Sequence, residues 1–155
     1  RFELEVTESV LITDTENVLR ELRSIKDLGV SVALDDFGTG FSSLSYLWRF
    51  PFDKLKVDKS FMTDLAVESS KSREILKTII ALGRVLDLKV TAEGVETEQQ
   101  AAVLRELHCD LVQGYLFGRP MRAIDVAATI MRDMAPALPD VRVPGMHALA
   151  ERARG

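Results

Sequence analysis

Strand-like and helix-like segments alternate along this chain, and that alternation constrains the fold more than any other feature. Five segments have the length and apolar content of strands, roughly 2–8, 30–37, 52–58, 89–95 and 111–117. Five helix-like segments follow them in turn, roughly 15–28, 42–50, 68–86, 97–107 and 123–134. Repeated strand–helix units form a parallel sheet, so we predict an α/β fold.

The strand-like segments are predicted to have one apolar and one small or polar face. In the second segment, Val32 and Leu34 alternate with Ala33 and Asp35. A sheet covered by helices on both sides would be apolar on both faces. One polar face with charges near the C-terminal strand ends favours a (β/α)8 TIM-like barrel, of which about five βα units are present in this chain.

The length of the chain is shorter than such a barrel needs. It has 155 residues, whereas a complete barrel typically takes about 250 residues and eight strands. A strand-like segment begins directly after Arg1, which we interpret as the mark of a longer parent chain, with deliberate truncation as the alternative. We predict that residues 1–134 form the C-terminal part of a barrel domain and that 135–155 form an extended or partly disordered tail.

The charge and composition exclude several classes of function. A formal net charge of −4 argues against nonspecific binding to DNA and against direct contact with an anionic membrane. No apolar segment approaches the length of a membrane span, about 20 residues, and we expect no signal peptide. The single cysteine, Cys109, cannot form an internal disulfide, so a cytoplasmic location is expected.

Charged side chains are predicted to converge at the C-terminal mouth of the barrel. The set comprises Glu5, Asp35, Asp36, Lys56 and Glu93, with Gln113 directed to the same region. Four neighbouring carboxylates repel each other, and either protonation or divalent cations would relieve that repulsion. Oxygen ligands without His or Cys suit hard ions such as Mg²⁺, Mn²⁺ or Ca²⁺. Two such ions about 3.5–4 Å apart can clamp a phosphate for in-line attack.

Two further features fit chemistry on a phosphate ester, although each has a plainer explanation. Lys56 would place a cation where negative charge develops, but a lone lysine is more often a surface residue with a packed stem. The turn at Gly38, Thr39 and Gly40 precedes a predicted helix, whose first N–H groups attract phosphate. Taken alone, two aspartates before such a turn usually cap it.

Five segments of the sequence match a known family in order and in spacing. They are LEVTES at 4–9, ALDDFGTGFSSLSYL at 33–47, DKLKVDKSF at 53–61, VTAEGVET at 90–97 and DLVQGYLFGRP at 110–120. Over residues 2–134 the chain resembles the EAL-type phosphodiesterases of bacterial cyclic di-GMP signalling. The resemblance implies metal-dependent hydrolysis of cyclic di-GMP to linear pGpG.

The resemblance also implies a role for each residue of the acidic cluster. Glu5, Asp35, Asp36 and Glu93 resemble the ligands of two Mg²⁺ or Mn²⁺ ions, with Asp35 bridging them and Ca²⁺ as an inhibitory ion. Lys56 resembles the catalytic lysine that contacts the attacking water, and Glu93 is expected to accept a proton as well.

Other residues resemble the supporting parts of the family's site. Asp58, Glu96 and Gln113 are similar to polar residues near the substrate or the metal–water cluster. Glu8 and the loop that starts at Phe37, Gly38, Thr39 and Gly40 resemble a mobile loop tied to dimerisation and metal binding, so a homodimer is expected.

The Glu-Ala-Leu segment that names the family, and an asparagine that follows it, are not in this sequence. Both would complete the first metal site, so we expect weak or no activity from this chain alone. The alternatives to an enzyme are a non-catalytic cyclic di-GMP receptor and a truncated interaction module. The intact acidic cluster favours the enzyme. Upstream sensor or GGDEF-type domains are expected in the parent protein, which could be membrane-anchored through other regions.

Overall fold

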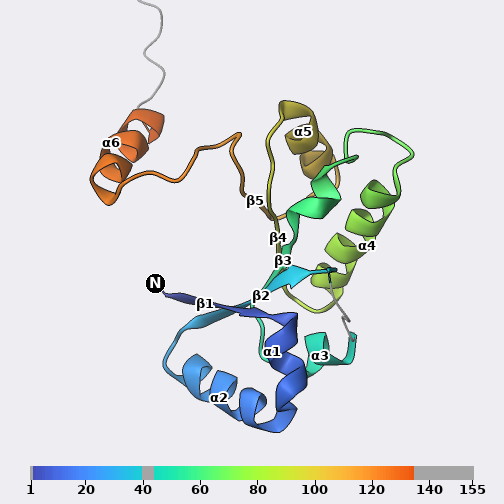
Figure 1. The fold of residues 1–155 in the computed structure, drawn as a ribbon, viewed down its shortest axis with the longest axis vertical. Coiled ribbons are helices and arrows are strands. Elements are labelled where there is room, and N and C mark those ends of the chain that lie inside the picture. Colours follow the sequence, from blue (N-terminus) through green and yellow to red (C-terminus); the bar gives the residue numbers. More distant parts are fainter. Residues whose placement is uncertain (1, 40–43, 135–155) are drawn as a thin grey trace, which may run out of the picture. The chain divides into compact units, whose positions relative to one another are not determined.

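Five parallel strands form a single sheet in the computed structural model, which describes residues 2–39 and 44–134. The strands are β1 (Glu3–Thr7), β2 (Ser31–Phe37), β3 (Lys54–Val57), β4 (Lys89–Ala92) and β5 (Leu111–Val112). Each strand pairs with the next one in the chain, in the order β1-β2-β3-β4-β5 (Figure 1). The predicted parallel α/β organisation is therefore confirmed.

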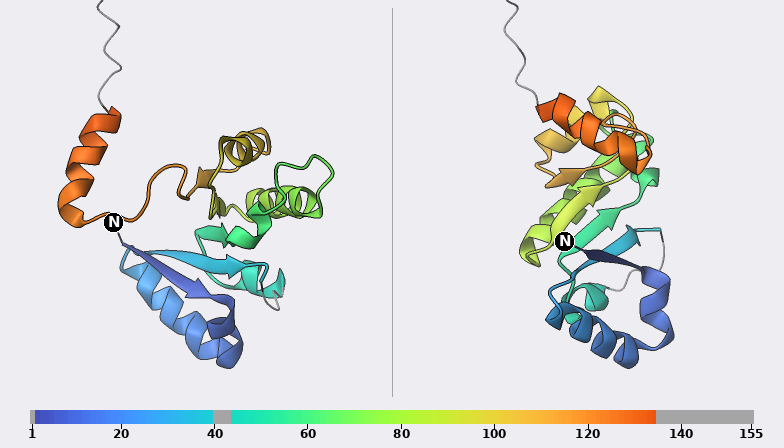
Figure 2. Two further views of the ribbon diagram at one scale, coloured as in Figure 1. Left: turned by 45° about the horizontal axis from the view of Figure 1, so that its top comes forward. Right: turned by 90° about the vertical axis from the view of Figure 1, so that its left-hand side faces the viewer.

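Helices follow the strands at the predicted places. They are α1 (Glu8–Thr13), α2 (Thr15–Asp27), α3 (Leu44–Arg49), the 3₁₀ helix η1 (Lys59–Met62), α4 (Lys71–Val85), α5 (Glu98–Glu106) and α6 (Ala123–Met134). The sequence did not predict α1 or η1. Figure 2 shows α2, α4 and α5 on one side of the curved sheet. Sequential strand order with helices on one side is typical of a barrel wall, since doubly wound sheets carry helices on both faces.

The main core lies between the sheet and these helices. Val32, Leu55 and Val90 on the outer face of the sheet are at most 1% exposed, and they pack in one cluster with helix residues such as Leu22 and Ile80. Burying a side chain of this size stabilises the fold by about 1.5–3 kcal/mol. The predicted alternation of an apolar outer face with a polar inner face thus holds in the three central strands.

A β-bulge at Asp36 changes the alternation at the end of β2. The pairing with β3 shifts register between Leu34 and Phe37, and Asp36 has a positive φ of 55°. A regular strand would turn adjacent aspartates to opposite faces. The bulge leaves Asp36 exposed beside Asp35 and returns Phe37 to the core, where it is 6% exposed. Phe37 is therefore a buried strand residue, and the predicted loop starts at Gly38.

Several predicted element ends were wrong by a few residues, for local reasons. β4 ends at Ala92 because Gly94 takes a φ of +71°, outside the strand region. α4 begins at Lys71, where the Ser70 hydroxyl accepts a hydrogen bond from the Arg73 N–H. Gly40, the predicted helix start at Ser42 and the predicted tail 135–155 lie outside the described residues.

The described residues 120–134 belong to a second unit, which contains α6. The predicted domain boundary between residues 134 and 135 stays a prediction. Among the described residues, no helix has the length and apolar character that crossing a membrane requires.

Two aspartates lock neighbouring strands together at their N-terminal ends. Asp53, just before β3, accepts a hydrogen bond from the Val32 N–H of β2 at 2.8 Å and pairs with Lys26 of α2. Asp110, just before β5, accepts one from the Val90 N–H of β4 at 3.0 Å. Each carboxylate thus fixes the register of a strand pair through a main-chain donor.

We expect Asp53→Ala to lower the free energy of unfolding by about 1–2 kcal/mol at pH 7, because it removes a charge-assisted hydrogen bond at a partly exposed site. Burial raises the pKa of Asp53, but the hydrogen bonds from Lys26 and Val32 outweigh burial and lower it. Its stabilisation is therefore present above about pH 4 and is lost as the pH falls through the folded-state pKa. Urea unfolding between pH 7 and pH 3 measures this, with exposed Asp64→Ala as the control.

Candidate active site

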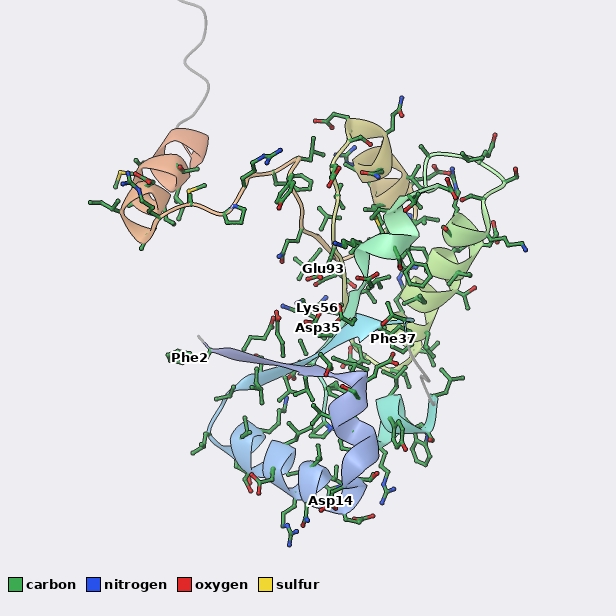
Figure 3. All side chains as sticks on the ribbon, viewed as in Figure 1. Phe2, Asp14, Asp35, Phe37, Lys56 and Glu93 are labelled. Carbon is green, nitrogen blue, oxygen red and sulfur yellow. The ribbon has the colours of Figure 1, made fainter. Side chains whose placement is uncertain are left out.

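Three carboxylates surround the ammonium group of Lys56. Lys56 Nζ lies 2.7 Å from Glu5 Oε2 of β1, 3.0 Å from Asp35 Oδ1 of β2 and 2.9 Å from Glu93 Oε1 just after β4. Figure 3 shows Asp35, Lys56 and Glu93 gathered beside the sheet. The strand parity predicted from the sequence places all of these side chains on the inner face, and the structure brings them together there.

The lysine is deeply set, whereas its partners are more accessible. The Lys56 side chain is 8% exposed, compared with 21% for Asp35, 22% for Glu93 and 47% for Glu5. Burial alone would lower the pKa of Lys56, but its ion pairs with Glu5, Glu93 and Asp35 outweigh burial and raise it. Lys56 is therefore held as a cation at neutral pH.

The inner face also contains polar atoms with unused hydrogen-bonding capacity. Asp35 Oδ1 and Thr91 Oγ1 are buried and make no hydrogen bond of acceptable geometry within the described residues. Thr91 lies on β4 directly opposite Lys56 of β3. Asp35 Oδ1 interacts with Lys56 through charge at 3.0 Å, and it retains capacity for a further partner.

A cleft of about 400 Å³ opens next to the cluster of Glu5, Asp35, Lys56 and Glu93. The residues lining the cleft come from the C-terminal ends of β2 to β5: Asp36, Asp58, Lys59, Glu93, Gly94, Glu96, Gln113, Gly114 and Tyr115. Five of the predicted site residues therefore share one cleft, namely Asp36, Asp58, Glu93, Glu96 and Gln113. Glu93 belongs to both groups and joins the cleft to the cluster.

Two glycines that line this cleft are in close contact with neighbouring residues. A Cβ on Gly94 would lie 2.3 Å from Lys59 Cβ, and one on Gly114 would lie 2.1 Å from the Val95 carbonyl oxygen. The N–H of Val95 also donates to the Gln113 carbonyl at 3.0 Å. Larger residues would force these turns apart, so both glycines are required by packing.

Glu8 and the turn after β2 contact each other. Glu8 begins α1, and its Oε1 accepts a hydrogen bond from the Gly38 N–H at 3.2 Å. Gly38 has a φ of +95°, which favours glycine. The Thr39 hydroxyl closes the turn by donating to the Asp36 carbonyl at 2.9 Å. Glu8 therefore helps to hold the turn that carries Asp36.

Two cleft residues that can contact a ligand, Lys59 and Tyr115, were not identified from the sequence. Lys59 is the one cation among the residues that line the cleft, and Tyr115 adds an aromatic ring. The Arg119 guanidinium lies 4.7 Å from the centre of the Tyr115 ring. Tyr115 and Arg119 lie within the matched segment 110–120, but nothing in residue spacing alone indicates that they approach each other.

The carboxylate oxygens of the site are of the type that binds hard divalent cations, but their positions are not those of a metal site. Every candidate ligand is a carboxylate, and Asp35 Oδ1 has capacity for another partner. Within the described residues, however, no three Asp, Glu, His or Cys side chains are grouped as a ready metal site. The carboxylates are arranged around the Lys56 ammonium instead.

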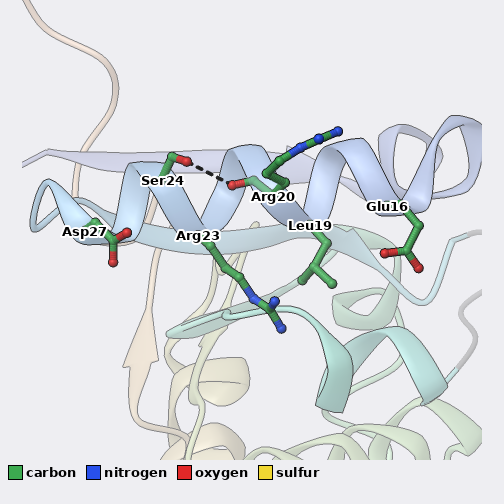
Figure 4. A pocket seen from close by; sticks show the side chains of 6 residues that line it. All are labelled: Glu16, Leu19, Arg20, Arg23, Ser24 and Asp27. Atoms are coloured by element: carbon green, nitrogen blue, oxygen red, sulfur yellow. Dashed lines mark hydrogen bonds between the residues drawn. The ribbon is translucent and has the colours of Figure 1, made fainter.

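A second hollow, of about 440 Å³, lies along α2 (Figure 4). Its lining residues are all from that helix: Glu16, Leu19, Arg20, Arg23, Ser24 and Asp27. It contains none of the clustered inner-face residues, and its side chains carry mixed charge. The candidate site is therefore assigned by the chemistry at the strand ends, and not by the volume of a hollow.

Comparison with models of protein families identifies the family of this chain. The model of the EAL domain matches residues 1–120. The chain belongs to the EAL domain family. This confirms the resemblance seen in the sequence motifs, which all lie within or at the end of the matched range.

Relatives and solved structures agree with the EAL assignment. The chain is 56% identical over 119 residues to the cyclic di-GMP phosphodiesterase NbdA of Pseudomonas aeruginosa, covering 77% of this chain and 15% of NbdA. The PaMucR phosphodiesterase in complex with c-di-GMP has a TM-score of 0.74 and 48% identity, covering 80% of this chain and 50% of that one. The predicted TIM-like barrel class is thereby confirmed.

A second solved structure contains a metal ion. Klebsiella pneumoniae BlrP1, in a manganese and cyclic di-GMP complex, has a TM-score of 0.71 and 37% identity, covering 76% of this chain and 30% of that one. The chain therefore spans half or less of each of these three relatives.

Proposed function

We propose that this EAL domain takes part in metal-dependent hydrolysis of cyclic di-GMP to linear pGpG in bacterial second-messenger signalling. The observation that carries the proposal is the group of three carboxylates around Lys56, which adjoins a polar cleft at the C-terminal ends of the strands. The C-terminal face is where barrel enzymes place their chemistry. NbdA, a cyclic di-GMP phosphodiesterase, is 56% identical in this region.

The reaction adds one water to a cyclic phosphodiester. The water oxygen bonds to phosphorus, the bond from phosphorus to the 3′-oxygen breaks, and the ring opens to pGpG. Glu93 lies at the junction of the cluster and the cleft, where it can accept the proton of the attacking water. Lys56 supplies positive charge to orient that water and to stabilise the charge that develops on the phosphoryl oxygens.

We propose Glu5, Asp35, Asp36 and Glu93 as ligands of two Mg²⁺ or Mn²⁺ ions, with Asp35 bridging and Ca²⁺ as an inhibitory ion. Bound ions would supply Lewis-acid stabilisation of the phosphate. The all-oxygen donor set supports this choice, as does the manganese in the BlrP1 complex. The bulge at Asp36 supports it too, because it keeps two adjacent carboxylates near one site.

Three of the remaining cleft residues are proposed to hold the substrate. Asp58, Glu96 and Gln113 offer hydrogen-bond partners to a nucleotide, and Glu8 supports the turn from Gly38. We also propose a cytoplasmic homodimer linked to upstream sensor or GGDEF-type domains. The support for linked domains is that the match covers only 15% of NbdA.

The test is a turnover assay on two purified proteins: this chain by itself and the full-length parent protein. Each is incubated with cyclic di-GMP and Mn²⁺ or Mg²⁺, and anion-exchange chromatography resolves substrate from pGpG. We expect the parent protein to form pGpG with either ion and not with excess EDTA, and the chain by itself to form little or none. Binding without cleavage would instead support a receptor, and neither binding nor cleavage would support an interaction module.

A further inference from the structure

The carboxylates proposed as metal ligands already hold a cation that belongs to the protein. Glu5, Asp35 and Glu93 each place one oxygen within 3.0 Å of Lys56 Nζ. These carboxylates come from β1, from β2 and from the residue directly after β4, so the sheet itself brings them to the lysine. The ammonium lies at the centre of the group and not on its rim.

A divalent ion could not share these oxygens with the ammonium without strong repulsion. A carboxylate oxygen binds Mg²⁺ at about 2.0–2.1 Å, which would bring the ion close to an ammonium held on the same oxygens. The repulsion would be poorly screened, because the Lys56 side chain is 8% exposed. In agreement, the described carboxylates form no ready metal site while they surround Lys56.

The cluster nevertheless retains an attraction for further cations. One ammonium neutralises only part of the charge of three carboxylates, and Asp36 adds another from the adjoining cleft. Buried Asp35 Oδ1 makes no hydrogen bond of good geometry. The remaining negative charge therefore attracts a metal ion, but the ion must break the contacts that Lys56 makes when it binds.

We infer that Lys56 is a built-in competitor of the metal ions, which holds the ligand carboxylates in place without metal and must leave them when metal binds. This inference rests on the proposed function, and it adds a regulatory role to a residue proposed for catalysis. Because binding of the two cations is coupled, weakening one must strengthen the other. The lysine then lowers metal affinity and keeps the empty cluster folded.

The test is calorimetric titration of Mn²⁺ into the purified protein without substrate. We expect Lys56→Met to bind Mn²⁺ about 10- to 100-fold more tightly than the unaltered protein, within the usual range of coupling between sites. The matched control is Lys54→Met. Lys54 lies on the same face of β3 and pairs with Glu3 at 2.6 Å, but it does not contact the proposed ligands in any ion pair found within the described residues. Its affinity should change less than about twofold.

The outcomes separate this inference from the proposed function. Tight binding by all three proteins with equal affinity would refute competition while leaving the metal centre in place. Absence of Mn²⁺ binding in all three would overturn both. Weaker binding by Lys56→Met would show that the lysine supports the ions and does not oppose them.

A second measurement uses the unaltered protein, in case Lys56→Met fails to fold. Lysines are acetylated in EDTA or in saturating Mg²⁺, and mass spectrometry gives the ratio of modification at Lys56 to that at Lys54. Release from three carboxylates should raise this ratio several-fold in Mg²⁺. An unchanged or lower ratio at metal saturation would contradict the inference.

Discussion

Lys56→Ala is expected to lower the turnover number of cyclic di-GMP hydrolysis about 10²–10³-fold, the usual effect of removing one preorganised electrostatic group. The Michaelis constant should change little, because the lysine acts on charge that develops in the transition state. The geometry supports this role, since Lys56 is buried, positively charged and next to Glu93 at the cleft. Steady-state kinetics with saturating Mn²⁺ measure both constants.

Lys54→Ala is the matched control for this loss of charge. It removes a lysine two positions earlier on the same face of the same strand, where the ion pair is with Glu3. We expect near-normal turnover from it. If Lys56→Ala raised the Michaelis constant at constant turnover, Lys56 would be a substrate-binding residue instead. Tighter metal binding together with slower turnover in Lys56 variants would separate its two proposed roles.

Asp35→Asn is expected to lower turnover by about 10²-fold or more, because it removes the charge that is proposed to bridge two ions. The replacement is nearly isosteric, and Asp35 is 21% exposed, so the fold should tolerate it. Mn²⁺ affinity should fall in the same variant. Asparagine keeps an oxygen but loses the negative charge, so the loss of affinity reports on electrostatics and not on packing.

Asp53→Asn serves as the control for Asp35→Asn. Asp53 is also an ion-paired carboxylate beside the strands, but it lies at their N-terminal ends with Lys26 and the Val32 N–H. We expect it to cost stability and to leave Mn²⁺ affinity unchanged. Unchanged Mn²⁺ affinity in Asp35→Asn would contradict the bridging role.

The layout of the cluster could be predicted because it depends only on the period of a strand. Alternate residues face the same side, so the apolar positions Leu55 and Val57 assign Lys56 to the opposite face. The same reasoning places Glu5, Asp35 and Glu93 on that face. Parallel pairing in sequential order then brings them together.

Other features depend on local backbone geometry that residue patterns do not reveal. The bulge at Asp36 needs a positive φ in a residue other than glycine, and only the structure shows that Asp36 lines the cleft while Asp35 contacts Lys56. The roles of Asp53 and Asp110 depend on main-chain donors in neighbouring strands. Tyr115 and Arg119 meet only because the chain turns after β5.

The most direct test of the metal centre is anomalous scattering from crystals of the protein grown with Mn²⁺. We expect anomalous peaks within about 2.0–2.3 Å of the carboxylate oxygens of Asp35 and Glu93, with Lys56 Nζ moved away from the oxygens that it contacts in the structure described above. The absence of any peak at these carboxylates at saturating Mn²⁺, with Lys56 still bound to all three, would contradict the proposed metal centre.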